Sequence, residues 1–529
     1  MWLWKSLCIT IVVYCCLLKS SYSQDVTLDE ALQLPRIHRM MSKPIEPRGE
    51  AFPNITGPAS FDSRIAVLGA DAAGVHMAYR LKKLGYTNVI ILEPDDHVGG
   101  DSLTVYHRGV RHELGTGHFR VENADILSMI MDFGMGPVHT LGDISLWPDS
   151  EQHEGILQYL MIDASQRTNV SNPVTVLKML SDAVITYIDI HREVFGDYDG
   201  TLMQRPLEHH IQKINGTIED FLQRNRITIL ESLFRILFTS QGYGHLDKSA
   251  AFYALMFVTP QRLIRMLESL VDPTNIGDTY VLERGFSALW SEIVAKANLD
   301  VRFNQNISFI IRTPERIDIY YNYIENSGNV ETYDFLIIAR DMSKVLDILD
   351  TSWIERQIFS HLTPSFMTSS LIDTNFGKRG PLPRASYMFN IKSRTDHSVL
   401  YHEDSYSILN HIRGTNYSRG LIAGGNDGEL YQSIVVRQFG DSFPSTEDIN
   451  TGFLKHADLY GITHGLVLAR KTWNYFPRFG PAEVAAGILW DIFTLQGQKN
   501  TWFIGPSVCF ESLNSVIDYN NRILQYYTL

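Results

Sequence analysis

The chain has 529 residues, with 46 Lys and Arg against 59 Asp and Glu and a formal net charge of −13. Its 44% hydrophobic and 20% charged residues are typical of a globular protein and exclude a collagen-like, coiled-coil or disordered one. The acidic balance argues against nucleic-acid binding, because phosphate contacts require clustered Lys and Arg. At this length we expect about two to four domains.

The N-terminus has the pattern of a secretory signal peptide. Lys5 provides a positive start, a mostly apolar stretch runs from Ser6 to Leu18, and small residues flank a cleavage point near Ser23. The apolar stretch is too short for a membrane-spanning helix, although an uncleaved anchor is the alternative interpretation. We therefore predict a signal peptide over residues 1–23, a secreted, extracellular protein and no membrane span in the mature chain.

The cysteines and the glycosylation sequons agree with a secreted protein. Three of the four cysteines lie inside the predicted signal, so Cys509 is the one thiol left and no intramolecular disulfide is expected. Asn-x-Ser/Thr sequons are candidate N-glycan sites on surface loops of a secreted chain. They occur at Asn54, Asn169, Asn215, Asn306 and Asn416.

The first regular elements form a βαβ pattern. Residues 24–60 contain several prolines and no clear period, which predicts an extended lead-in. Residues 64–68 and 88–92 are apolar runs typical of buried strands, and residues 72–84 between them have helical spacing. Two strands joined by a helix predict a parallel sheet.

Further along, the pattern changes twice. Residues 123–273 are largely helical, and Thr217-x-x-Asp220 resembles a capping box that begins one of these helices. The remaining chain alternates strands and helices. We expect a helix at 288–297, strands within 301–323, at 335–339, 366–373, 421–425 and 501–504, and a last helix at 513–526.

The turn after the first strand carries the chemistry. It reads Gly69-Ala70-Asp71-Ala72-Ala73-Gly74, and Glu93 ends the next strand 24 residues after Gly69. Gly69 permits a tight turn, Gly74 lets the helix pack against the sheet, and the helix N-terminus faces a pyrophosphate. An acid at the position of Glu93 accepts hydrogen bonds from a ribose hydroxyl. The pattern predicts dinucleotide binding, and a βαβ unit without a ligand is the alternative.

The motif continues in a way that resembles a known superfamily. After Glu93 come Gly99-Gly100 and Thr104, then Glu113-Leu114-Gly115-Thr116. With this continuation the chain resembles the flavin-dependent amine oxidase superfamily, whose FAD domain has a Gly-Gly pair and a later [D/E]-L-G-[AT] segment.

Later segments fit the same resemblance. Gly285-Phe286 and Ile307 look like the return of the chain to the FAD domain, and residues 333–339 like its later strand. Tyr475-Phe476-Pro477 resembles the aromatic wall of the flavin, and 502–505 the closing strand. The ending most resembles the β-cyclopiazonate dehydrogenase-like group.

The resemblance implies an α/β fold: a Rossmann-type FAD-binding domain with a discontinuous mixed α+β substrate domain. The FAD domain would comprise residues 61–122, 278–345 and 480–529, and the substrate domain residues 123–277 and 346–479. The implied cofactor-binding residues are Gly69, Ala70, Gly74, Glu93, Gly99, Gly100, Thr116, Ile307, Gly505 and Ser515.

Three residues depart from the family pattern. Asp71 replaces the middle glycine, and His97 and Asp101 stand where many members carry arginines. Each change removes a phosphate-friendly group or adds negative charge. Two like charges about 5 Å apart repel by roughly 3 kcal/mol at an effective dielectric of about 20. Either Asp71 points away from the cofactor or FAD binding is weakened.

The resemblance implies a secreted oxidoreductase with non-covalent FAD, because residues 471–474 lack the cysteine that some relatives attach to the flavin. Such an enzyme moves a hydride from a small-molecule substrate, such as an amine, to flavin N5, with O2 as acceptor. Tyr475 and Phe476 would face the flavin, and no catalytic base is identified. The alternatives are a fatty-acid double-bond isomerase and a flavin-free binding protein that kept the fold.

No metal site is predicted. His112 and His118 are six residues apart with glycines between them, whereas a zincin helix places two histidines four residues apart.

Overall fold

The protein is described from a computed structural model. The structure describes residues 28–50, 52–107, 109–117, 119–120, 124–136, 138–140, 145–146, 154–197, 204–271, 279–324, 327–375, 387–388, 408–413, 421–424, 429–459 and 463–527. The predicted signal peptide at residues 1–23 lies outside these ranges.

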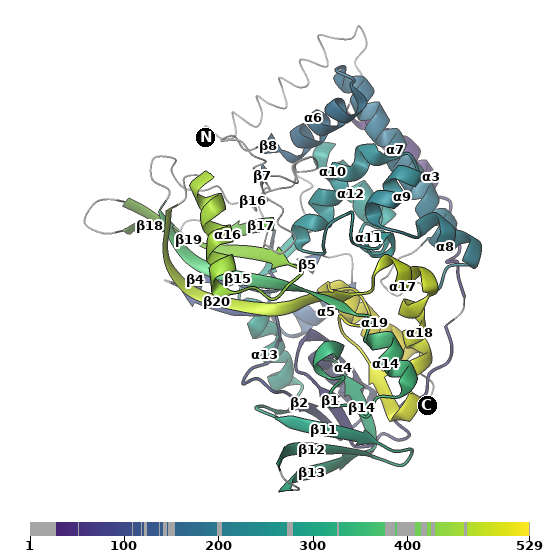
Figure 1. The fold of residues 1–529 in the computed structure, drawn as a ribbon, viewed down its shortest axis with the longest axis vertical. Coiled ribbons are helices and arrows are strands. Elements are labelled where there is room, and N and C mark those ends of the chain that lie inside the picture. The colour runs from purple at the N-terminus through teal and green to yellow at the C-terminus, as the bar shows by residue number, and fades with distance from the viewer. Residues whose placement is uncertain are drawn as a thin grey trace.

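A five-stranded parallel sheet lies in the lower half of the molecule, above the antiparallel strands of residues 307–333 (Figure 1). In spatial order its strands are β10 (Asp300–Arg302), β2 (Val89–Leu92), β1 (Ile65–Leu68), β14 (Phe335–Ile338) and β21 (Thr501–Phe503). All residues of β1, β2, β14 and β21 are buried. Helices cover both faces of such a sheet, so its strands are continuous apolar runs. The predicted α/β fold with its βαβ start is confirmed.

Helices and a small antiparallel sheet surround the parallel strands. Helix α4 (Ala72–Leu84) follows β1, and α13 (Phe286–Lys296) and α19 (Leu513–Tyr526) pack against it. Helices α14 (Trp353–Phe359), α17 (Pro481–Ala486) and α18 (Ile488–Leu495) form another group. The antiparallel strands are β11 (Ile307–Arg312), β12 (Ile317–Ile324) and β13 (Ser327–Tyr333).

The helical stretch predicted from the sequence forms a lobe at the other end of the molecule (Figure 1). Its helices are α6 (Ile156–Thr168), α7 (Pro173–Phe195), α8 (Glu208–Ile214), α9 (Ile218–Arg224), α10 (Glu231–Leu237), α11 (Ala251–Phe257) and α12 (Pro260–Val271). The capping box at the start of α9 is confirmed. Thr217 Oγ1 accepts from Asp220 N at 3.1 Å, and Asp220 Oδ2 accepts from Thr217 N at 3.0 Å.

A curved antiparallel sheet lies between the helical lobe and the parallel sheet (Figure 1). It consists of β15 (Thr363–Asn375), β16 (Tyr387–Met388), β17 (Ile408–Arg413), β18 (Leu421–Gly424), β19 (Glu429–Gly440) and β20 (Thr463–Arg478), with α16 (Thr446–Leu459) packed on β20. Shorter pairings complete the fold. They involve β3 (Thr104–His107), β4 (Val110–Glu113), β5 (Phe119–Arg120), β6 (Val138–Thr140), β7 (Ser145–Leu146), β8 (Glu154–Gly155) and β9 (Thr279–Leu282).

The extended lead-in predicted for residues 24–60 is wrong in its first part. Residues 28–41 form two short helices, α2 (Leu28–Ala31) and α3 (Leu34–Met41). Pro35 stands in the first turn of α3, where a missing N–H costs no helical hydrogen bond. Leu34 and Ile37 are buried, and α3 packs against α12. The prolines were therefore misinterpreted as evidence against a helix.

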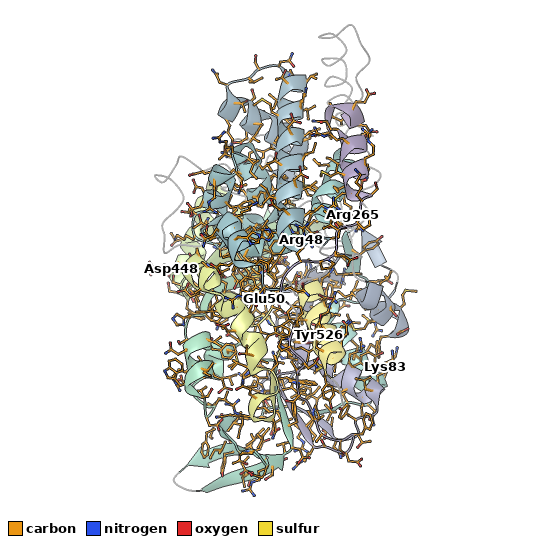
Figure 2. The ribbon with its side chains drawn as sticks, turned by 90° about the vertical axis from the view of Figure 1, so that its right-hand side faces the viewer. Arg48, Glu50, Lys83, Arg265, Asp448 and Tyr526 are labelled. Carbon is orange, nitrogen blue, oxygen red and sulfur yellow. The ribbon has the colours of Figure 1, made fainter. Side chains whose placement is uncertain are left out.

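The second part of the lead-in is extended and connects the two halves of the molecule. Arg48 N donates to Phe195 O at 3.0 Å, and Ile55 forms a bridge with Tyr527. Figure 2 shows Arg48 and Glu50 where the helical lobe meets the lower half, with Tyr526 below them.

One predicted domain boundary also needs correction. We placed residues from 123 onward in the substrate domain, yet α5 (Ala124–Asp132) packs against α19 of the FAD-binding half. The ring of Phe133 lies against that of Tyr79 on α4, and Lys296 donates to Phe133 O at 2.7 Å. This segment completes the cover of α4, which a helical pattern by itself does not reveal.

Surface features bear on the remaining expectations. Asn54, Asn169 and Asn306 are exposed, Asn215 is half-buried, and Asn416 lies outside the described residues. N-glycosylation stays a prediction. Among the residues that the structure describes, no helix is long and apolar enough to cross a membrane.

Candidate cofactor and substrate site

The turn between β1 and α4 has the close packing that a dinucleotide-binding turn needs. Gly69 has φ of +103°, a conformation that favours glycine. A Cβ atom on Gly74 would lie 2.0 Å from the carbonyl oxygen of Gly69, so only glycine fits there. Gly505, after β21, packs beside this turn, since its Cβ would lie 2.8 Å from Ala339 O and 3.5 Å from Ala73 Cβ.

Asp71 caps α4 instead of leaving its N-terminus open. Its Oδ1 accepts from Gly74 N at 2.9 Å, and the residue has the extended backbone of an N-cap. The carboxyl group therefore stands where the helix N-terminus would meet a phosphate. Burial, and then Glu93 and Asp101, raise the pKa of Asp71 to about 7, against the hydrogen bond from Gly74.

Glu93 lies at the end of β2, as the sequence predicts. Its Oε2 accepts from Ala70 N at 2.6 Å and its Oε1 from Asp95 N at 2.9 Å. These bonds fix the carboxylate against the glycine turn, in the place from which an acid reaches a ribose. Ile307 begins β11 close by, because Gln305 N donates to Glu93 O at 2.9 Å.

The Gly99-Gly100 pair closes over the turn. Gly99 N donates to Ala70 O at 2.7 Å, and a Cβ on Gly100 would lie 2.8 Å from Asp71 Cβ. A Cβ on Gly115 would lie 1.4 Å from Asp101 O, so the two loops touch through their backbones. The structure thus gathers Gly69, Ala70, Gly74, Glu93, Gly99 and Gly100 at one end of β1 and β2.

A pocket begins beyond these loops. Its wall combines residues of the FAD-binding half, the helical lobe and the antiparallel sheet. Its lining residues are Asp101, Gly115, Thr116, Gly117, Phe119, Gln241, Tyr243, Phe257, Arg262, Met367, Arg437, Phe439, Tyr475, Glu511, Ser512, Leu513 and Asn514. The predicted residues Thr116 and Tyr475 are among them, and the N-terminal turn of α19 reaches the pocket through Leu513 and Asn514.

Aromatic rings form one wall of the pocket. Tyr475 and Tyr243 stack with ring centroids 5.9 Å apart and an interplanar angle of 7°, and Tyr475 Oη donates to Gln241 O at 3.0 Å. Phe476, predicted to face the flavin as well, is 1% exposed and does not line the pocket. It packs among other rings of the core, including that of Tyr253, and its φ is +47°.

A buried arginine faces the same pocket. Arg437 on β19 is 7% exposed, and its Nη2 donates to the carbonyl oxygens of Glu113 and Gly115. Among the described residues no carboxylate forms an ion pair with it, and its Nε has no hydrogen-bond partner. Burial lowers the pKa of Arg437. A second arginine, Arg262, stacks at 4.0 Å over the ring of Phe257.

The acids at the pocket are poorly solvated. Burial raises the pKa of Asp101 to about 6, although Arg437 acts against this shift. Glu511 accepts from Phe476 N at 2.7 Å, and burial, followed by the charge of Asp101, raises its pKa well above the ordinary value. Arg437 and Arg262 place two guanidinium groups at the pocket, beside the carboxyl groups of Asp101 and Glu511.

The residues of this site can be compared with what FAD binding requires. The close glycine turn, Glu93, the Gly99-Gly100 loop and the α19 N-terminus offer the backbone cradle that FAD needs, and Asp71 is the one misfit at the diphosphate position. Ser515 is buried and bonds through its N to Ser512 Oγ at 3.2 Å, so it acts within the α19 cap. Overall the residues fit the cofactor, with Asp71 as a modified contact.

Sequence reasoning missed several pocket residues, notably Tyr243, Arg262, Arg437 and Glu511. For Arg437 a signal existed, since it interrupts the apolar run Ile434-Val435-Val436 of a buried strand. The other residues come from segments far apart in the chain, and no local pattern connects them. Asp101, noted only as a departure from the family pattern, also lines the pocket.

Comparison with known proteins agrees with this geometry. Residues 72–368 match the model of the family described as flavin containing amine oxidoreductase. The polyenoic fatty acid isomerase of Ptilota filicina is 22% identical over 509 residues, which cover 88% of this chain and 95% of that protein.

Solved structures show the same fold. The CLA-producing fatty acid isomerase from P. acnes superposes with a TM-score of 0.68 at 20% identity, over 89% of this chain and 100% of that one. A variant of putrescine oxidase superposes with a TM-score of 0.60 at 12% identity, over 88% and 99% of the two chains. The match to the β-cyclopiazonate dehydrogenase-like group stays a prediction.

Proposed function

The chain belongs to the family of flavin-containing amine oxidoreductases, and from this premise we propose that it is an FAD-dependent isomerase that shifts double bonds in an unsaturated fatty acid. The observation that carries the proposal is the pocket, where Arg437, which forms no ion pair among the described residues, faces an aromatic wall. A likeness to a polyenoic fatty acid isomerase along nearly its whole length supports it.

The chemistry of the pocket selects an anion with an apolar body. A buried guanidinium is costly without a counter-ion, and a carboxylate restores the charge-assisted hydrogen bonds that it lacks. Tyr243, Phe439, Met367 and Tyr475 offer apolar contacts for an acyl chain. A cationic amine would meet Arg437 and Arg262 instead, which disfavours it in this pocket.

In this proposal the chain's own residues bind, orient and shield. The turn at Gly69 and Gly74, together with Glu93 and the Gly99-Gly100 loop, would hold FAD, which when bound accepts and returns a hydride. Arg437 would bind the substrate carboxylate, and the rings of Tyr243 and Tyr475 would orient the chain and exclude water. Burial raises the pKa of Glu511 well above its ordinary value and so favours the uncharged carboxyl group, which does not oppose the substrate carboxylate.

The binding would be non-covalent. Thr472, Trp473 and Asn474 on β20 offer no thiol, and Cys509, a free thiol, is buried with its Sγ bonded to Gly505 O at 3.2 Å. We also keep secretion and N-glycosylation as proposals, which rest on residues 1–23 and on the sequons.

A second candidate is oxidation of an amine with O2 as acceptor. The carboxyl group of Asp101 at the pocket favours it, because an ionised carboxylate binds cations. A flavin-free binding protein is the third outcome. Release of flavin from the denatured protein excludes that outcome, and peroxide formation separates an oxidase from an isomerase.

The test is an anaerobic assay with linoleate, followed through the ultraviolet absorbance of a conjugated diene. We expect diene formation without peroxide. Arg437→Met should lower kcat/KM by about 30-fold, since a hydrogen bond to a charged group contributes about 2 kcal/mol. Arg316→Met, at an arginine whose side chain is 61% exposed, is the control and should change nothing.

The methyl ester of linoleate completes the design. It lacks the carboxylate, so wild-type protein should disfavour it by about the same factor, and Arg437→Met should no longer distinguish ester from acid. Equal turnover of acid and ester by the wild type would contradict the role of Arg437. Peroxide with putrescine, and no diene from linoleate, would favour the amine oxidase.

A further inference from the structure

The diphosphate position of this chain contains an acid. Asp71 stands at the N-terminus of α4, and its Oδ1 accepts from Gly74 N at 2.9 Å. Helix N-termini bind phosphate through such amides. Because the position expected for Gly100 Cβ lies 2.8 Å from Asp71 Cβ, the side chain is packed against the neighbouring loop. A bound diphosphate would therefore contact the carboxyl group.

The surroundings of Asp71 are mostly acidic. Glu93 at the end of β2 and Asp101 after the Gly-Gly pair both raise its pKa, and Arg340 packs its Cγ over Gly69. The charge of Asp71 also raises the pKa of Cys509 and that of Glu511. His76 and Arg80 lie on the same helix α4, Asp341 after β14 raises the pKa of Glu511, and Asp96 pairs with His97 in the loop after β2.

We propose that Asp71 joins the FAD diphosphate site in its protonated form, so that binding of the cofactor takes up a proton. A protonated carboxyl keeps one oxygen as acceptor for Gly74 N and uses the other to donate to a phosphate oxygen. An ionised carboxylate would repel the diphosphate, by roughly 3 kcal/mol for two unit charges about 5 Å apart. Burial of Asp71, which raises its pKa to about 7, means that little energy is needed to protonate it near neutral pH.

The inference concerns the cofactor and not the substrate. It rests on membership of a flavin-containing family and on the position of Asp71, so failure of the isomerase assay would leave it standing. Its readout is FAD binding by the flavin-free protein, measured as quenching of FAD fluorescence, and it does not require turnover.

For one group with a pKa near 7 that must be protonated, the Kd for FAD should rise about tenfold between pH 6 and pH 8. Asp71→Asn is neutral at every pH, can cap α4 and can donate from its Nδ2, so its Kd should be flat over this range. In a weakly buffered solution at pH 8, wild-type protein should take up about one proton per FAD bound, and Asp71→Asn none.

Two controls keep the test specific. Asp96→Asn changes an acid whose side chain is 83% exposed and should show the same dependence of Kd on pH as the wild type. His97→Gln removes the neighbouring histidine and should also show the same dependence of Kd on pH as the wild type. Unfolding temperatures verify that each variant is folded.

Three results would overturn the proposal. They are a Kd of the wild type that does not change with pH, a slope in Asp71→Asn equal to that of the wild type, and an absence of FAD binding by both proteins at every pH. A Kd that falls as pH rises would contradict it as well.

Discussion

The parallel-sheet half and the helical lobe differ in the contacts that stabilise each of them. In the parallel-sheet half the closest contacts are made by backbone, as where the position of a Cβ on Gly74 lies 2.0 Å from Gly69 O. In the helical lobe side chains make many of the contacts, beside close backbone approaches such as that at Gly196, where a Cβ would lie 2.1 Å from Glu46 O. Tyr187 donates to Val258 O at 2.6 Å and packs against the rings of Phe221 and Phe234.

The difference shows where each half tolerates change. Side-chain contacts are numerous and individually modest, so a helical lobe loses stability in small steps. A backbone contact at a turn leaves no room for even one additional methyl group. The cofactor site belongs to the second kind, and its geometry should fail abruptly while the lobe weakens gradually.

The largest effect is expected for Gly74→Ala. The new methyl group would overlap Gly69 O, so α4 must move away from β1, at a cost of about 3 kcal/mol or more and with loss of FAD binding. Chemical denaturation and flavin content of the purified protein measure both. Gly136→Ala is the matched control, because no atom lies within 4 Å of its Cβ position. If the Gly74→Ala protein kept its flavin, the cofactor site would not fail abruptly, and the expected difference between the two halves would be wrong.

An intermediate effect is expected for Asp101→Asn, and it should depend on pH. The folded pKa of Asp101, about 6, lies above its ordinary value of 3.8, so the native state binds the proton more tightly and loses stability as pH rises between these values. At pH 8 the variant should be more stable than the wild type by about 3 kcal/mol. At pH 4 the two unfolding free energies should agree. A difference in unfolding free energy that does not vary with pH would contradict the attribution of the effect to the ionisation of Asp101.

The smallest effect is expected in the helical lobe, for Thr217→Ala. Loss of the capping box at α9 should lower the unfolding free energy by about 1 kcal/mol and leave FAD binding intact. Thr186→Ala, at an exposed position of α7, should change it by less than about 0.5 kcal/mol. A loss of flavin from Thr217→Ala would show that the two halves are more tightly coupled than their contacts indicate.

Local patterns predicted the elements well where a single segment carries the whole signal. Helix α4 has the predicted bounds, β14 and β21 differ by one residue, and the capping box at Thr217 is confirmed. The N-terminal helices were missed because the prolines of residues 24–60 and the lack of a clear period predict an extended segment. The position of α5 was missed because its partner α19 lies almost 400 residues further along the chain.

The sequence by itself determined the glycine turn, the acid at Glu93 and the departure at Asp71, because strand, turn and helix are local and their spacing is read along the chain. Only the tertiary structure decided what faces the pocket. Arg437, Tyr243 and Glu511 belong to three separate segments, and their burial beside one another follows from the packing of two sheets and a helical lobe. The charge state of such groups depends on the solvent that packing removes, which no linear pattern records.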